Sequence, residues 1–318
     1  MIKEIDLPAG AAPGNAPAVM REALAYGVFL ARHSIPAALL DDAYGLLGEF
    51  FALPADAKLA HRVPGTNGQA GYTPALIETA ERSRQADWKE LFHWGRPLPP
   101  GHPLRQRYPS RYPDPVMPDE AVPGIGAALA KLHEAMAEFQ LDVTDLIAAA
   151  LDVDPGFFRE MLSDGPVVNR AAWYPPMAGA PTEGHVWAVE HQDFDLITAL
   201  PRATCAGLEV LVGGQWHRLT PPEGYAVMVT GMVLERLTSG AVPAVFHRVA
   251  AAGGQEARLS IVQFCHPTPW TVLAPLALPP GLRAPARFPV LTAGDLFDRT
   301  MYRINRLDPA GRGGPDAG

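Results

Sequence analysis

Two histidines and an aspartate in the second half of the chain have the types and spacing needed to hold a metal ion. His191 and Asp193 are separated by one residue, and His247 lies in a second segment that we expect to be extended. Side chains at positions i and i+2 leave the same face of a strand, so His191 and Asp193 can both point at one ion if their segment is extended. Two imidazoles and one carboxylate on a single face, with the remaining positions open, form the ligand set of a non-haem iron(II) site.

A polar pair further along the chain supports this interpretation, because a lone His-x-Asp arises readily by chance in a chain with ten histidines. Arg258 follows His247 by eleven residues, and Ser260 shares its strand face. A guanidinium beside a hydroxyl is a good receptor for a carboxylate, because Arg binds it through two parallel hydrogen bonds. The alternative is that the histidines and the aspartate are satisfied within a core and that Arg258 is an ordinary surface residue.

With these residues the chain resembles the isopenicillin N synthase-like branch of the 2-oxoglutarate- and Fe(II)-dependent dioxygenases. The resemblance runs from about residue 26 to residue 270 and rests on several anchors in the same order as in the family. Besides the metal residues and Arg258-x-Ser260, the anchors are Tyr26-Gly27-Val28-Phe29, Phe50-Phe51-Ala52-Leu53-Pro54, Gly71-Tyr72, Trp88-Lys89-Glu90-Leu91-Phe92 and Trp173-Tyr174-Pro175-Pro176.

The resemblance implies an oxygenase whose iron is bound by His191, Asp193 and His247, which are also the catalytic residues. Fe(II) would act with two co-substrates, O2 and 2-oxoglutarate, and 2-oxoglutarate would be decarboxylated to succinate and CO2. Arg258 and Ser260 match the family pair that holds the distal carboxylate of 2-oxoglutarate. Tyr174 matches the tyrosine that assists them.

Two departures from the family pattern bear on the co-substrate. Where many members have Asn-Tyr-Tyr-Pro, this chain has Ala172-Trp173-Tyr174-Pro175, and Met232 stands where many members have Asp after glycine. In the family's namesake enzyme, moreover, the equivalent pocket receives a substrate carboxylate and no 2-oxoglutarate is used. That second mode stays open at this point.

Similarity to the family also indicates where the substrate binds. Phe194 follows a metal residue directly, and Phe264 has the same strand parity as Arg258, so we expect both to face the cavity near the iron. Arg82 and Arg84 lie in a loop that is a candidate lid, whose cations could meet an acidic group. The alternative is core packing for the phenylalanines and solvation for the arginines. An apolar wall with few polar anchors suits a secondary metabolite, such as an antibiotic precursor, or a modified amino acid.

Two other classes of function compete with an oxygenase. A non-catalytic jelly-roll binding protein with a residual site would be expected to lose its polar groups, whereas the metal residues and Arg258-x-Ser260 are all present. A zinc hydrolase could also use two histidines and an aspartate, but it offers no reason for the Arg-x-Ser pair.

Composition limits the partners and the compartment. A formal net charge of −8 argues against a nucleic-acid partner, so we expect a small-molecule substrate. Cys205 and Cys265 are too few for a disulfide framework, and no run approaches the roughly 18 apolar residues of a membrane-spanning helix. We therefore expect a cytoplasmic protein without membrane contact, and the sequence makes no prediction of its oligomeric state.

The elements that position the site are expected mainly after Gly165, where the pattern changes to short extended runs. Eight such strands with frequent turn signals predict a double-stranded β-helix, the jelly-roll architecture of cupin-like enzymes, in a mainly β protein with flanking helices. The expected strands are residues 167–174, 185–190, 195–200, 207–212, 216–219, 225–230, 243–250 and 258–265.

The first half is expected to be mainly helical with edge strands. The longest helix is predicted over residues 125–151, where apolar residues recur at three- and four-residue steps, and it should pack on the sheet. His133 lies at the edge of that apolar stripe and is predicted at the surface. We expect a single dioxygenase unit over residues 1–318: a mainly helical part (1–164), a jelly-roll core with the metal site (165–270), an extension with a helix (271–307) and a flexible tail (308–318).

Overall fold

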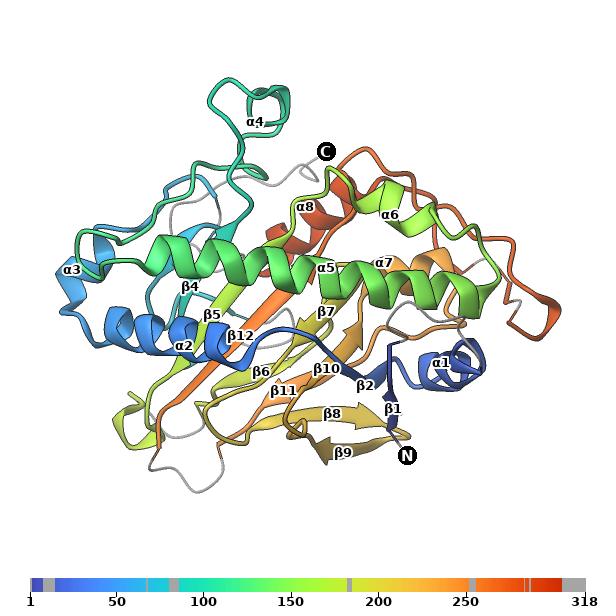
Figure 1. Cartoon of the computed structure of the whole chain (residues 1–318), viewed down its shortest axis with the longest axis horizontal. Coiled ribbons are helices and arrows are strands. Elements are labelled where there is room, and N and C mark those ends of the chain that lie inside the picture. Colours follow the sequence, from blue (N-terminus) through green and yellow to red (C-terminus); the bar gives the residue numbers. More distant parts are fainter. Residues whose placement is uncertain are drawn as a thin grey trace.

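Two β-sheets form the centre of the computed structural model (Figure 1). The structure describes residues 2–7, 15–66, 68–79, 86–181, 185–251, 256–282, 284–285 and 287–304, except the side chain of Tyr302. The larger sheet contains, in spatial order, β1 (Lys3–Ile5), β2 (Val28–Arg32), β10 (Tyr225–Thr230), β7 (Ile197–Leu200), β12 (Arg258–Cys265), β5 (Val168–Tyr174), β4 (Glu90–Gly95) and β3 (Gly71–Thr73). The smaller sheet contains β6 (Ala188–His191), β11 (His247–Val249), β8 (Leu208–Val212) and β9 (Gln215–Arg218).

The two sheets pack face to face and enclose an apolar layer. Val210 of the smaller sheet is fully buried in one cluster with Val227, Val229 and Val262 of the larger sheet. All eight strands expected after Gly165 are present as β5 to β12, with ends shifted by a few residues, and the prediction of a jelly-roll core is confirmed.

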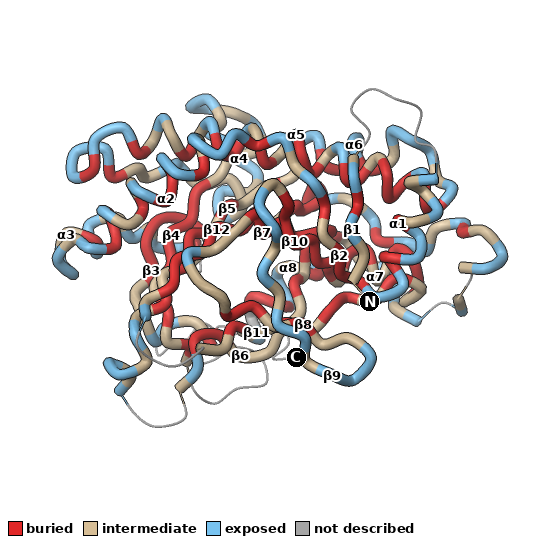
Figure 2. The backbone as a smooth tube through the Cα atoms, turned by 60° about the horizontal axis from the view of Figure 1, so that its bottom comes forward, coloured by how far each residue is buried: buried red, intermediate tan, exposed pale blue. Residues whose placement is uncertain are grey.

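Helices cover the outer face of the larger sheet. The longest, α5 (Ile125–Leu151), has the predicted bounds, and it lies across the strands beside α2 (Ala37–Ala52) and α1 (Ala16–Leu24) (Figure 1). Its apolar stripe, including Leu129, Leu132 and Met136, is fully buried against the sheet. Figure 2 shows this pattern along the chain, with buried residues along the sheet and exposed residues on the outer turns of the helices.

Strands from the first half of the chain complete the sheet that carries the site. β1 to β4 form its two edges, and β4 pairs with β5, so that His93 lies opposite Arg170. The short helix α3 (Ala55–Leu59) is fixed to this edge, because Lys58 Nζ lies 2.6 Å from Glu90 Oε2 and Tyr72 donates a hydrogen bond of 2.7 Å to the same oxygen.

Three features of the first half and the site region were not predicted. These are the strand β3, the helix α4 (Pro103–Arg107) and the helix α7 (Met232–Leu237), which follows β10. The surface position predicted for His133 is wrong: the side chain is buried, and Asn169 Nδ2 lies 2.6 Å from its Nδ1. The polar partners come from distant strands, so the helical pattern alone could not reveal them.

The described chain ends with α8 (Ala293–Ile304). The remaining helical elements are the short helix α6 (Phe157–Leu162) and the 3₁₀ turns η1 (Met177–Gly179) and η2 (Pro280–Leu282). Thr292 and Asp295 form a capping box at the start of α8, in which each backbone N–H donates to the side chain of the other at 3.1 and 3.0 Å. The tail predicted over residues 308–318 lies outside the described residues.

Among the described helices, none combines the length and apolar character required to cross a bilayer.

Candidate metal centre and its two pockets

The three predicted metal ligands are brought together at the end of the smaller sheet. His191 is the last residue of β6 and His247 the first of β11, and the two are directly paired across the strands. Asp193 lies two residues beyond the end of β6, where the chain turns towards β7. One donor atom from each of the three side chains lies within 4.8 Å of the others, the spacing needed to surround one ion.

Both imidazoles present the same nitrogen to the centre. His191 Nδ1 lies 2.8 Å from the Val189 carbonyl oxygen, and His247 Nδ1 lies 3.3 Å from that of Val245. A carbonyl oxygen accepts only, so Nδ1 carries the proton and Nε2 has a free lone pair. The two Nε2 atoms lie 3.9 and 3.7 Å from the carboxylate oxygens of Asp193, so all three ligand groups converge.

The carboxylate of Asp193 is held from behind by a hydroxyl. Thr198 Oγ1 lies 2.5 Å from Asp193 Oδ2 and 3.0 Å from Asp195 Oδ2, and Asp195 also accepts from the Cys265 N–H. Asp195 is fully buried, and a Cβ on Gly231 would collide with its Oδ1. Asp195 therefore has a structural position behind the ligands and does not belong to the metal-binding set.

The electrostatics of the centre favour the ligating forms of its side chains. Burial and the neighbouring His247 lower the pKa of His191 to about 4, which keeps the ring neutral at pH 7. Burial would raise the pKa of Asp193, but the two histidines and Thr198 lower it below its usual value. Burial and the charge of Asp193 raise the pKa of Asp195 well above the ordinary range.

A small pocket of about 40 Å³ lies on one side of the three ligands. Arg258, Ser260 and Tyr174 line it, all nearly inaccessible to solvent, and Arg258 pairs directly with Tyr174 across β12 and β5. The Arg258 guanidinium lies 5.2 Å from the centroid of the Tyr174 ring and donates from Nε to the Cys205 carbonyl oxygen at 3.1 Å.

These residues fit the distal carboxylate of 2-oxoglutarate. Arg258 Nη1 is buried and has no hydrogen-bond partner among the described residues. A buried, unpaired guanidinium N–H is unfavourable by a few kcal/mol unless an acceptor meets it, and a carboxylate is the acceptor that suits it best. Because the same pocket is also lined by His191, Asp193 and His247, one small dicarboxylate could contact both Arg258 and the metal.

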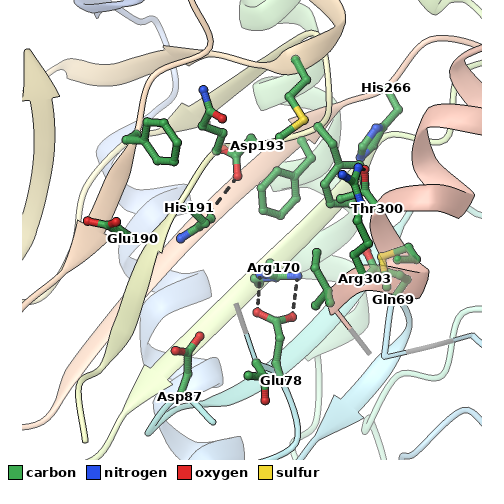
Figure 3. A pocket seen from close by; sticks show the side chains of 18 of the residues that line it. Gln69, Glu78, Asp87, Arg170, Glu190, His191, Asp193, His266, Thr300 and Arg303 are labelled. Atoms are coloured by element: carbon green, nitrogen blue, oxygen red, sulfur yellow. Dashed lines mark hydrogen bonds and ion pairs between the residues drawn. The ribbon is translucent and has the colours of Figure 1, made fainter. Parts of the chain in front are cut away.

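A larger pocket of about 270 Å³ also borders His191 and Asp193 (Figure 3), and it shares Lys89, Arg170 and Phe264 with the small pocket. Phe194 and Phe264 both line it, and each ring packs against His266, with centroid distances of 5.4 and 6.4 Å. Their part in substrate binding remains a prediction. Arg82 and Arg84, the candidate lid cations, lie outside the described residues.

Sequence reasoning missed the charged wall of the larger pocket. Glu78, Asp87, Lys89 and Arg170 line it, and we call these four residues the ion-pair cluster. Arg170 has the same strand parity as Ala172 and Tyr174, so the alternation of β5 was the signal that could have found it. Lys89 directly precedes β4 and points into the pocket, whereas Glu90 points towards α3.

Comparisons with protein families match two parts of the chain. Residues 6–119 match the N-terminal family of non-haem dioxygenases in morphine synthesis, and residues 163–267 match the 2OG-Fe(II) oxygenase superfamily. Gibberellin 20 oxidase 2 of Oryza sativa subsp. indica is 31% identical over 284 residues, which cover 88% of this chain and 69% of the relative. Validamycin A dioxygenase of Streptomyces hygroscopicus subsp. limoneus is 30% identical over 285 residues, covering 85% of this chain and 75% of the relative.

Solved structures match nearly the whole chain. A putative 2OG-Fe(II) oxygenase family protein from Caulobacter crescentus superposes with a TM-score of 0.78 at 29% identity, covering 98% of this chain and 99% of that one. A full-length Neurospora crassa protein, solved in complex with alpha-KG, gives a TM-score of 0.80 at 22% identity, covering 95% of each chain, a likeness that concerns the fold.

Proposed function

Because the chain belongs to the 2OG-Fe(II) oxygenase superfamily, we propose that it oxidises a small organic molecule at the centre formed by His191, Asp193 and His247. Members of this superfamily are enzymes that use Fe(II), 2-oxoglutarate and O2. The proposed outcome is hydroxylation, desaturation or cyclisation of the substrate.

The main support for this proposal is that two pockets border the same metal ligands. His191 and Asp193 line both the small pocket with Arg258 and the larger pocket with Phe194. A co-substrate in the first and a substrate in the second would therefore both lie beside the same ion. A non-catalytic binding protein has no need of this arrangement.

Each side chain has a definite task in the proposed reaction. When bound, iron and 2-oxoglutarate supply the oxidising chemistry, in which decarboxylation to succinate and CO2 is coupled to oxidation of a substrate C–H group. His191, Asp193 and His247 would hold the iron on one face and leave the other face open. Arg258 and Ser260 would bind the distal carboxylate of 2-oxoglutarate, and Tyr174 packs beneath the guanidinium and assists.

The walls of the larger pocket exclude water and orient the substrate. Phe194, Phe264, Met232 and Met301 provide apolar surface, so the substrate loses water as it enters. We propose a secondary metabolite or a modified amino acid as the substrate class. Two of the relatives are named for small molecules of this kind, mugineic acid and validamycin A.

We also propose that residues 1–318 act as a single unit. The support for this is the larger sheet, in which β4 from the first half of the chain pairs with β5 from the second half. The wall of the substrate pocket likewise combines Lys89 with His191.

The decisive experiment is anaerobic titration of the Fe(II) protein with 2-oxoglutarate. A metal-to-ligand charge-transfer absorption should appear, and succinate should form once O2 and a substrate are supplied. If the wild type shows neither the band nor succinate, the mode of the isopenicillin N synthase namesake, without 2-oxoglutarate, replaces this proposal.

A further inference from the structure

The ion-pair cluster is held together unevenly. Lys89 Nζ lies 2.6 Å from Glu78 Oε1 and 2.7 Å from Asp87 Oδ2, which are short, charge-assisted hydrogen bonds. Asp87 also accepts from the Val189 N–H at 3.0 Å, which ties the cluster to β6. Lys89 therefore holds both acids firmly.

Arg170 is held much more loosely by the same cluster. Its two η nitrogens lie 3.4 and 3.3 Å from the Glu78 oxygens, well beyond the roughly 2.7–2.9 Å of a charge-assisted hydrogen bond. Nε donates to His93 Nε2 at 2.7 Å. A guanidinium has five N–H groups, so two remain without a partner among the described residues.

The guanidinium lies where a bound molecule could reach it. Arg170 lines the larger pocket beneath His191 and Asp193 and also borders the small pocket, with its terminal nitrogens directed at Glu78 (Figure 3). Its carbon Cζ lies 5.0 Å from the centroid of the Phe264 ring, so the cation borders the apolar wall. The pocket thus places a partly unpaired guanidinium beside an apolar ring, within a lining that also contains polar side chains such as Gln192, Thr300 and Arg303.

We infer that Arg170 binds a carboxylate of the primary substrate, which takes the place of Glu78 on the guanidinium while Lys89 retains Glu78. The inference deepens the proposed function and rests on it. The substrate class it names is a carboxylic acid that fits a pocket of about 270 Å³ and has an apolar part beside Phe264. Glu78 shows that a carboxylate fits this edge of the guanidinium, and its 2.6 Å contact with Lys89 preserves a counter-charge after displacement.

The test uses two probes of nearly the same shape, one with a charged carboxylate and one with a neutral amide. Hydrocinnamate and its neutral amide, hydrocinnamamide, are titrated by calorimetry into the anaerobic enzyme loaded with Fe(II) and saturated with 2-oxoglutarate. Saturation blocks Arg258, so the probes report on the larger pocket. Hydrocinnamate should bind about tenfold tighter than the amide, because a charge-assisted pair is stronger than a neutral hydrogen bond.

Two variants should change the preference in opposite directions. Arg170→Gln should abolish the preference for hydrocinnamate over the amide. Glu78→Gln removes the competing carboxylate, so hydrocinnamate should bind several-fold tighter while the amide is unaffected. If the cluster has a purely structural role, Glu78→Gln loosens the pocket wall. Hydrocinnamate and the amide would then each bind with the same affinity as to the wild type, or more weakly.

The results separate this inference from the proposed function. If the charge-transfer band with 2-oxoglutarate forms normally but the amide binds as tightly as hydrocinnamate, the carboxylate assignment is wrong and the enzyme assignment stands. If Arg170→Gln instead raises the 2-oxoglutarate concentration needed for the band more than it weakens hydrocinnamate, Arg170 serves the co-substrate and the inference fails. Should Arg170→Gln not fold, Glu78→Gln still decides the matter, because only the carboxylate assignment predicts tighter binding of hydrocinnamate with unchanged binding of the amide.

Discussion

Thr198 donates a hydrogen bond of 2.5 Å to the carboxylate of Asp193, the acid among the three metal ligands. The hydroxyl is almost completely buried and fixes the direction in which the carboxylate points. Groups that orient a metal ligand in this way commonly change metal affinity by about 10–100-fold when they are removed. Thr198 is therefore a positioning residue for the metal centre.

The variant Thr198→Val keeps the shape of the side chain and removes the donor, so Fe(II) affinity should fall by about tenfold or more. Thr198→Ser keeps the hydroxyl, so its Fe(II) affinity should be close to that of the wild type. A purely structural role of Thr198 would not require the hydroxyl. Thr144→Val is the matched control, because this buried hydroxyl bonds only to the Leu141 carbonyl oxygen in α5 among the described residues. Equal iron affinity in wild type and Thr198→Val, measured by competition with a chelator, would contradict the assignment.

Replacement of any one metal ligand should abolish turnover and leave the fold largely intact. His191→Ala, Asp193→Ala and His247→Ala each remove one of three converging donors, and two donors hold iron far less tightly. Iron content after dialysis, turnover and circular dichroism are the measurements. His217→Ala, an exposed histidine on β9, is the control and should retain iron and activity. Near-normal iron binding in any of the three variants would remove that residue from the ligand set.

Arg258→Gln should raise the 2-oxoglutarate concentration needed to form the charge-transfer band. The lost charged hydrogen bond corresponds to about 1.5–3 kcal/mol, or roughly ten- to a hundredfold in affinity. Arg218→Gln, on the exposed strand β9, is the matched control and should behave as the wild type. An unchanged titration in Arg258→Gln would show that the distal carboxylate binds elsewhere.

Folding stability should decline as the pH falls through the acidic range, in part because of His133. Burial lowers the pKa of this histidine from 6.5 to about 4, and the Asn169 amide donates to its Nδ1, which must be unprotonated. The unfolded chain takes up this proton near pH 6.5 and the folded protein only near pH 4, so stability is lost between these values. At pH 5 the loss from this one group is about 2 kcal/mol.

Urea unfolding at pH 7 and pH 5 measures this contribution. His133→Gln has no titrating group at this position and should lose about 2 kcal/mol less than the wild type between the two pH values. His93 and His266 also have lowered pKa values, so the wild type loses stability through several groups, and the comparison isolates one. The same decline in both proteins would mean that His133 is protonated in the folded state.

Local periodicity predicted the elements well, because each strand or helix carries its own pattern. The alternation of β12 placed Arg258, Ser260 and Phe264 on one face, and all three line the small pocket. Partners from distant segments could not be predicted in this way. Arg170 and His93 meet only through the register of β4 on β5, and no local pattern contains that register.

The same limit explains the error at His133. An α-helical pattern shows which residues lie at the edge of the apolar stripe, but not whether another element of the fold supplies a polar partner for them. Here Asn169 of β5 lies 2.6 Å from the ring and Gln263 of β12 donates to the His133 carbonyl oxygen at 3.1 Å. The Asn169 contact gives one ring nitrogen a partner, which lowers the cost of burying the neutral imidazole.

The last prediction concerns the coupling of co-substrate consumption to product formation, with the natural substrate or a surrogate that supports turnover. Phe194 and Phe264 line the larger pocket beside the metal ligands, where they can hold a substrate C–H group in place. In Phe264→Ala and Phe194→Ala, product formation should fall more than 2-oxoglutarate consumption. The reason is that the co-substrate is still consumed when the substrate C–H group is poorly positioned, but the substrate is then not oxidised. Phe158→Ala is the control, since this ring is buried against α5 away from the pocket and its loss should lower the melting temperature without changing the ratio. If both pocket variants lose product and co-substrate turnover equally and melt at lower temperature, the two phenylalanines only support the core.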